Sequence, residues 1–144
     1  MAELETTHIF VGSKDRVFRG ISRFDQYPTY IPGVTKVEVG PATNKEANCL
    51  VRYELNIIKS FFYTLEMFEK TPDRLWWSLK DSNLMKQNNG SWEFEALGKD
   101  KTKAVYRLDI KFKGLVPSMI TDQIAKANLP LMFGGFQKLI DNTP

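Results

Sequence analysis

Apolar and polar residues alternate along much of the middle of the chain. In residues 49–58, for example, Val51 and Tyr53 alternate with Arg52 and Glu54. A period of two residues with one polar face is typical of antiparallel strands that are wetted on one side. The pattern and the β-branched residues predict strands at 4–11, 34–39, 49–58, 62–70, 75–80, 91–96 and 104–112.

Two short helical segments are predicted between the first and the second of these strands. Ser13 offers an N-cap in front of Val17, Phe18 and Ile21, which are spaced for one face of a helix. The second segment, residues 25–33, is a short helix or turn that ends in proline and glycine. A strand followed by two helical segments and six further strands predicts an antiparallel sheet in an α+β protein.

The final segment changes from a period of two to the spacing of a helix. Pro117 suits the first turn of this helix. Pro130 is expected to bend it, because proline has no N–H and clashes with the carbonyl of Lys126. We therefore expect one long, bent C-terminal helix that covers the sheet. Its apolar stripe is formed by Val116, Ile120, Ile124, Ala127 and Leu131.

The overall composition restricts the function only slightly. A chain of 144 residues with 42% hydrophobic and 26% charged residues fits one domain over residues 1–144, and excludes a disordered chain or a disulfide scaffold. The 20 basic and 17 acidic residues are interleaved, which favours a solvated surface over nucleic-acid recognition. No secretory signal or run of about 20 apolar residues is visible, so we expect a cytoplasmic protein.

Residues that commonly carry catalysis or bind metals are scarce. His8 is the only histidine and Cys49 the only cysteine, so neither a zinc site of side-chain ligands nor a Ser-His-Asp relay can be assembled from them. We expect both to be ordinary strand residues. Paired carboxylates are not found at the predicted inward positions, which leaves general acid–base catalysis without an evident residue. We therefore expect no metal and no cofactor.

Five aromatic residues with polar tips fall on the apolar faces of the predicted strands. A buried Tyr O–H or Trp N–H needs a partner, and leaving one unpaired costs about 1–3 kcal/mol. Each ring could pack in the core and bond a backbone carbonyl. As a set they favour a cavity that contains water or a ligand, because dry cores are built mainly from Leu, Ile, Val and Phe. The five rings are Tyr53, Tyr63, Trp77, Trp92 and Tyr106.

Three local features leave alternatives open. Asn89-Gly90 has the composition of a hairpin turn, but its closeness to the strand at 91–96 is equally compatible with a bulge or a loop. The apolar hairpin tip at Ile57–Phe62 is covered by neighbouring loops, touches a membrane transiently, or rims a pocket. Gly134-Gly135 permits either close packing of the last helix on the sheet or a flexible gate.

Three segments of the sequence resemble the START-like (SRPBCC) superfamily, especially its coenzyme Q-binding and polyketide cyclase/dehydrase branch. The first is FDQYPTYIPGVTKVEV at residues 24–39. The second is NGSWEFEALGKDKTKAVYRLDIKFKGLVPSMI at residues 89–120, and the third is LPLMFGGFQKLI at residues 129–140. The resemblance implies a helix-grip fold, in which a curved sheet of seven strands wraps a long C-terminal helix around a hydrophobic cavity.

By matched position, the resemblance implies that Trp92, Phe94, Tyr106 and the helix from Val116 to Phe136 line this cavity. The strand alternation adds further inward positions. The candidate ligand-binding residues are Tyr53, Tyr63, Met67, Trp77, Trp92, Phe94, Tyr106, Leu108, Ile120, Ile124, Leu131 and Phe136.

Three functions are compatible with these observations. The leading hypothesis is binding or transport of a hydrophobic small molecule, such as a lipid, an isoprenoid quinone or a polyketide, without catalysis. The second is a cyclase, aromatase or dehydratase in which Tyr53 or Tyr106 donates a proton. The third is a module that docks on the ribosome, because a ribosome-associated toxin belongs to the same branch. The interleaved charges make this third hypothesis the least supported.

Overall fold

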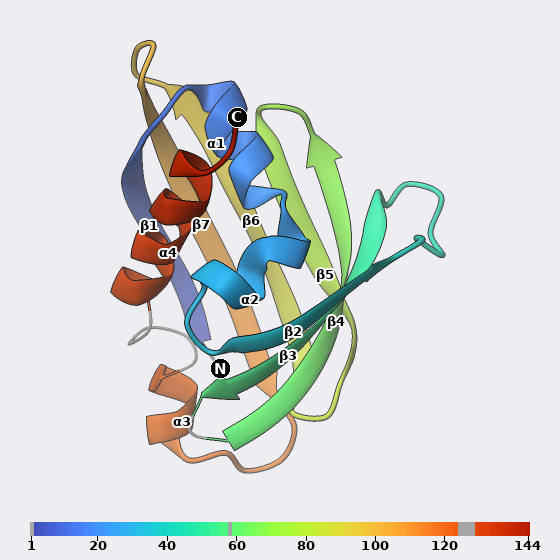
Figure 1. Cartoon of the computed structure of the whole chain (residues 1–144). Coiled ribbons are helices and arrows are strands. Elements are labelled where there is room, and N and C mark those ends of the chain that lie inside the picture. Colours follow the sequence, from blue (N-terminus) through green and yellow to red (C-terminus); the bar gives the residue numbers. More distant parts are fainter. Residues whose placement is uncertain (1, 58, 124–128) are drawn as a thin grey trace.

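Seven antiparallel strands form one curved sheet (Figure 1). The computed structural model describes residues 2–57, 59–123 and 129–144. The strands follow each other across the sheet in the order β1-β7-β6-β5-β4-β3-β2, which confirms the predicted antiparallel sheet and places the first strand beside the last. The strands are β1 (Ala2–Val11), β2 (Val34–Gly40), β3 (Cys49–Ile57), β4 (Lys59–Lys70), β5 (Arg74–Ser82), β6 (Met85–Ala96) and β7 (Lys101–Phe112).

Helices cover one face of this sheet (Figure 1). Ser13 caps the first of them, as predicted, because its Oγ accepts a hydrogen bond from the backbone N–H of Arg16 at 3.2 Å. The helices are α1 (Lys14–Ile21), the short 3-10 helix η1 (Phe24–Gln26), α2 (Tyr27–Tyr30), α3 (Ser118–Asp122) and α4 (Leu129–Asp141). The sheet and α4 enclose the core, which is the predicted α+β helix-grip arrangement.

α3 begins one residue after Pro117, at the predicted start of the C-terminal helix, and Val116 precedes it. Pro130 lies near the described start of α4, so one continuous, bent helix through residues 124–128 stays a prediction. The predicted positions Ile124 and Ala127, and the Lys126 carbonyl invoked for the bend, lie outside the described residues. In α4 the buried residues include Phe133, Phe136, Leu139 and Ile140.

All three alternatives for Asn89-Gly90, a hairpin turn, a bulge or a loop, are wrong, because both residues lie inside β6 and pair regularly with β7. Gly90 pairs with Trp77 of the neighbouring strand β5. A Cβ atom added to Gly90 would lie 2.3 Å from Cζ2 of the Trp77 indole. The glycine is required here by the large ring that lies over it, and not by turn geometry.

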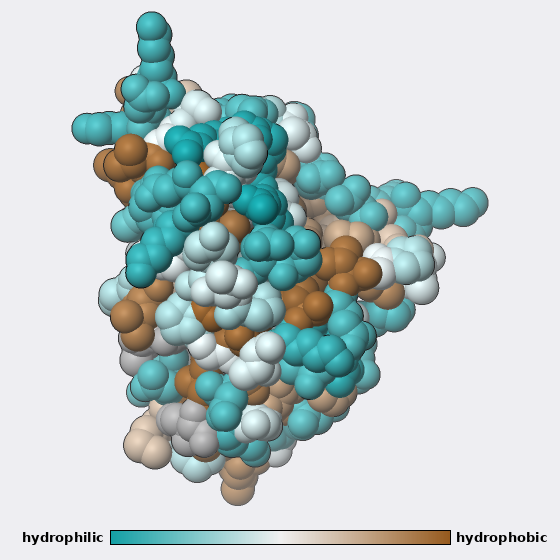
Figure 2. Space-filling view, viewed as in Figure 1, coloured by the Kyte–Doolittle hydropathy of each residue, from teal (hydrophilic) through white to brown (hydrophobic). Residues whose placement is uncertain are grey.

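Exposed apolar residues are scattered over several elements, and the visible face is largely hydrophilic with separate hydrophobic patches (Figure 2). Isolated apolar residues of this kind are normal for a protein surface. Within the described ranges, no helix combines the length and the apolar character needed to cross a membrane.

Candidate functional site

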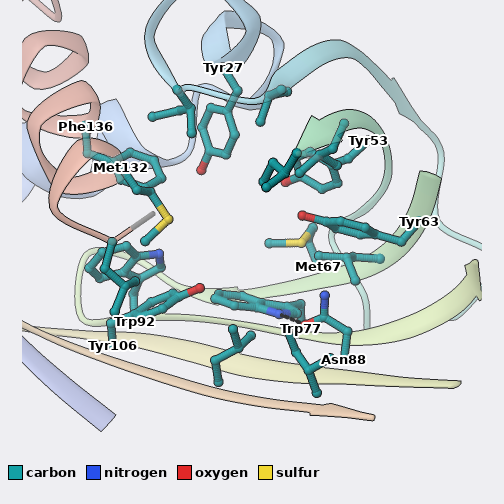
Figure 3. Close-up of a pocket in the computed structure, with 18 of the residues that line it drawn as sticks. Tyr27, Tyr53, Tyr63, Met67, Trp77, Asn88, Trp92, Tyr106, Met132 and Phe136 are labelled. Carbon is teal, nitrogen blue, oxygen red and sulfur yellow. Dashed lines mark hydrogen bonds between the residues drawn. The ribbon is translucent and has the colours of Figure 1, made fainter. Parts of the chain in front are cut away.

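A cavity of about 120 Å³ lies between the inner face of the sheet and the helices α2 and α4. Its walls come from every strand except β1, together with the turn that joins α2 to β2. Figure 3 shows aromatic rings and methionine side chains surrounding this space. The described lining residues are Tyr27, Ile31, Pro32, Val34, Tyr53, Leu55, Ile57, Tyr63, Leu65, Met67, Leu75, Trp77, Met85, Asn88, Trp92, Tyr106, Leu108, Ile110, Leu129, Met132 and Phe136.

Eight of the twelve candidate residues lie around this cavity. They include the whole set of five rings with polar tips, because the period of two turns each of them to the inner face of its strand. The eight residues are Tyr53, Tyr63, Met67, Trp77, Trp92, Tyr106, Leu108 and Phe136.

The other candidates lie elsewhere. Phe94 is buried one inward position beyond Trp92, where its ring stacks on Trp92 at 6.0 Å and meets Phe18 of α1 edge-on at 5.8 Å, and it is not part of the described cavity wall. Ile120 is half-buried in α3 and is not part of the cavity wall. Leu131 is 62% exposed, on the side of α4 opposite its buried residues. Ile124 lies outside the described residues.

The structure adds lining residues that were not among the sequence candidates. Tyr27 enters the cavity from α2, and Met132 enters it from α4, one residue after the exposed Leu131. Asn88 is an inward residue of β6, in phase with Gly90 and Trp92. The strand alternation, followed back from Trp92 in two steps of two residues, leads to Asn88. The sequence Asn88-Asn89-Gly90 is typical of a turn, however, and so hides this inward position.

Two residues of the hairpin tip, Ile57 and Phe61, also face inward, whereas Lys59 and Ser60 are exposed. Ile57 ends β3 and lines the cavity, and Phe61 is buried near the start of β4. Of the three alternatives considered for this tip, this placement matches the rim of a pocket. Ile58 lies outside the described residues.

One polar pair in the cavity wall is bonded within the protein. The indole N–H of Trp77 donates to Oδ1 of Asn88 at 3.0 Å, and the Nδ2 of Asn88 lies 3.6 Å from the sulfur of Met85. This bond orients the amide, with its carbonyl oxygen on Trp77 and its NH₂ group toward the interior (Figure 3). Tyr27 is also bonded, since its hydroxyl donates to the carbonyl oxygen of Ile21 at 2.5 Å.

Four other polar tips have no hydrogen-bond partner among the described residues: the hydroxyls of Tyr53, Tyr63 and Tyr106 and the indole N–H of Trp92. The fully enclosed unpartnered side-chain atoms of the described chain are elsewhere, on Ser22, Glu66 and Asp109. The four tips therefore face open cavity space. Figure 3 shows the hydroxyls of Tyr63 and Tyr106 pointing into it from opposite walls.

Burial keeps the cavity tyrosines protonated. Burial raises the pKa of the Tyr63 hydroxyl, and burial together with the nearby Tyr63 raises the pKa of Tyr106. The pKa values of Tyr27 and Tyr53 are raised well above the ordinary value, first by burial and then by neighbouring tyrosines. All four are therefore neutral phenols at physiological pH, able to donate a hydrogen bond.

Apart from these tyrosines, the described cavity wall contains no ionisable side chain. His8 lies on β1, where it stacks on Phe133 with ring centroids 4.8 Å apart, and Cys49 is a half-buried residue of β3. Burial raises the pKa of the Cys49 thiol, which opposes a role as a nucleophile. No group of three or more His, Cys, Asp or Glu side chains in the described ranges could hold a metal ion.

The fold is shared with solved structures of low sequence identity. A START superfamily protein from Mycobacterium smegmatis aligns with a TM-score of 0.83 and 16% identity, covering 96% of this chain and 97% of the other. A Thermus thermophilus protein gives 0.81 and 16%, with the same coverage. The Zhui aromatase/cyclase from a Streptomyces species gives 0.76 and 14%, covering 96% of this chain and 90% of the other.

A search of curated protein sequences finds no match. Residues 13–134 match the protein family described as polyketide cyclase / dehydrase and lipid transport. This segment begins at the cap of α1 and ends within α4, so it includes every described lining residue except Phe136. The chain therefore belongs to the polyketide cyclase / dehydrase and lipid transport family.

Proposed function

We propose that this protein binds a hydrophobic small molecule in the cavity between its sheet and α4. The observation that carries the proposal is the set of cavity-facing polar tips, on Tyr53, Tyr63, Tyr106 and Trp92, that have no partner among the described residues. A filled core would leave no space beside them, and an unpaired buried polar group costs about 1–3 kcal/mol. A ligand oxygen would satisfy one or more of these groups.

The cavity also carries a cost in stability. At roughly 24 cal/mol per Å³, a cavity of 120 Å³ left empty destabilises the fold by about 3 kcal/mol. Larger side chains at positions such as Leu65 or Leu108 would remove this cost. Retaining the space is consistent with a ligand that fills it.

The test is mass spectrometry of the purified protein under native conditions, followed by extraction of the bound molecules. The informative variant is Met132→Trp, which places a large ring at the cavity wall. Leu131→Trp is its matched control, because the neighbouring side chain is exposed. We expect a bound apolar molecule with the unmodified protein and with Leu131→Trp, and its loss with Met132→Trp.

Two results would contradict this proposal. One is a protein that holds no small molecule after purification and binds none of the lipids, quinones and aromatic polyketides added to it. The other is equal retention of the bound molecule by Met132→Trp and Leu131→Trp. In both cases folding would be checked by circular dichroism.

A cyclase or dehydratase is the second candidate, and the free hydroxyl of Tyr106 favours it. A neutral phenol that faces the bound molecule could donate a proton to a carbonyl oxygen during ring closure. Tyr106→Phe and Tyr53→Phe would then lower turnover while binding persists. An unchanged rate and product distribution in both variants would count against this function.

A further inference from the structure

We infer that the cavity selects a neutral, ring-sized molecule that carries a hydrogen-bond-accepting oxygen, such as a cyclic ketone. This inference rests on the proposed function, because it specifies the class of molecule that occupies the same cavity. Three properties of the cavity lead to this inference: its volume, the hydrogen-bonding groups of its wall, and the absence of charged side chains from the described lining residues.

The volume sets the size of the occupant. In another protein, an apolar cavity of about 150 Å³ accepts benzene. The cavity described here, at about 120 Å³, is of similar size, so it matches a single ring better than a long acyl chain. Met67 and Met132 contribute to the wall, and their flexible thioethers can adapt to small differences in ring shape.

The hydrogen-bonding groups set the position of an oxygen atom. The Trp92 indole is only a donor, and the hydroxyls of Tyr63 and Tyr106 are each free to donate. The strongest side-chain acceptor of the wall, Oδ1 of Asn88, is already occupied by Trp77 at 3.0 Å. The unpartnered indole and hydroxyls can all donate a hydrogen bond, whereas only the hydroxyls can also accept one. Such a wall therefore favours a ligand that accepts hydrogen bonds.

The lack of charge excludes ionised ligands. The described lining residues contain no Lys, Arg, His, Asp or Glu. A carboxylate or an ammonium group would lose its hydration without gaining a partner of opposite charge, at a large cost in free energy. The tyrosines cannot serve as counter-ions to a cation, because burial keeps their hydroxyls protonated. A neutral carbonyl is the group that fits this wall.

The test compares two molecules of nearly the same shape. Cyclohexanone and methylenecyclohexane differ by replacement of a carbonyl oxygen with a CH₂ group, and octanoate represents a charged, long-chain ligand. Binding is followed by titration of backbone amide shifts in NMR. We expect cyclohexanone to bind more tightly than methylenecyclohexane, and octanoate not to compete with it.

The hydroxyl groups are tested by Tyr63→Phe and Tyr106→Phe, which keep the rings and remove only unpartnered hydroxyls. We expect at least one of them to weaken cyclohexanone binding by roughly three- to tenfold. Neither should weaken binding of methylenecyclohexane. Tyr30→Phe is the matched control, because Tyr30 is half-buried and does not line the cavity.

The possible failures are distinguishable. Equal affinity for the two cyclic molecules, with no effect of either variant, overturns the role of the polar tips but leaves hydrophobic binding intact. Tighter binding of octanoate overturns the limits on size and charge. If a larger apolar molecule co-purifies with the protein and neither ring binds, the ring class is wrong and the proposed function stands. If no molecule binds in either experiment, both are wrong.

Discussion

Gly90 illustrates how one residue determines the shape of the cavity wall. Because it has no side chain, the Trp77 indole lies over the strand at this point and reaches the Oδ1 atom of Asn88. The missing side chain of Gly90 also explains why Asn89-Gly90, which has the composition of a hairpin turn, lies in the middle of a strand.

We predict that Gly90→Ala destabilises the protein by about 2 kcal/mol or more, because its Cβ would overlap the Trp77 ring and overpacking typically costs about 1–3 kcal/mol. Gly40→Ala is the control, since nothing lies within 4 Å of the added Cβ at that position in β2. Urea unfolding measures both. Similar stabilities of the two variants would show that the wall can relax around Trp77.

His8 gives the fold a dependence on pH. Its ring stacks on Phe133 and meets Phe10 edge-on, and partial burial lowers its pKa below the ordinary value of 6.5. The unfolded state therefore binds more protons than the folded state between the lowered pKa and about 6.5, so stability rises with pH across this interval.

We predict a fall in unfolding temperature when the pH is lowered from about 7.5 to about 5.5, and a smaller fall in His8→Gln. The comparison is clear because His8 is the only histidine of the chain. Thermal unfolding followed by circular dichroism measures it. An identical fall in both proteins would assign the effect to other groups.

At the scale of elements, the orientation of α4 decides which of its residues reach the cavity. Met132 and Phe136 line it and Leu131 does not, because residues four apart share a helix face and neighbouring residues do not. The two adjacent glycines of α4, Gly134 and Gly135, also lie on different faces of the helix. Gly135 packs against α2, where an added Cβ would lie 2.2 Å from the carbonyl oxygen of Tyr30, whereas Gly134 faces open space.

We predict opposite effects for the two glycines. Gly134→Ala should stabilise the protein by about 1 kcal/mol, the difference in helix propensity between alanine and glycine. Gly135→Ala should destabilise it by about 2 kcal/mol or more, because backbone atoms cannot move aside as a flexible side chain can. Chemical unfolding of the two variants tests this. Loss of ligand binding in Gly134→Ala alone would instead indicate that α4 must flex.

At the scale of the whole molecule, contacts between α1 and the C-terminal end of the chain join two helices that lie far apart in the sequence. The Nε of Arg16 donates to the carbonyl oxygen of Thr143 at 2.8 Å, and its Nη2 donates to that of Asp141 at 2.8 Å. The same helices meet closely at Gly20, where an added Cβ would lie 2.9 Å from Cγ1 of Ile140. These contacts fix α4 over the sheet and thereby maintain the cavity.

We predict that Arg16→Met destabilises the protein by about 1–2 kcal/mol, because two carbonyl groups lose a charged donor. Lys103→Met is the control, because this residue of β7 makes no hydrogen bond or ion pair with α4 or the residues after it in the described part of the chain. Its ion pair with Glu95 is exposed, and such pairs contribute about 0–1 kcal/mol. Hydrogen exchange of α4 amides should accelerate in Arg16→Met. Unchanged exchange in that variant would mean that other contacts hold α4 in place.

The sequence by itself determined the strands and the faces of their residues. Tyr53 and Trp92 lie on the inner face because alternation is a local property of an extended chain. The tertiary structure decided which inner-face residues meet empty space, since that depends on the distances between elements. Phe94 shares the alternation of Trp92 but packs under α1. Tyr27, Asn88 and the inward rotation of Met132 were equally set by packing, because no local period records how α2, β6 and α4 approach one another.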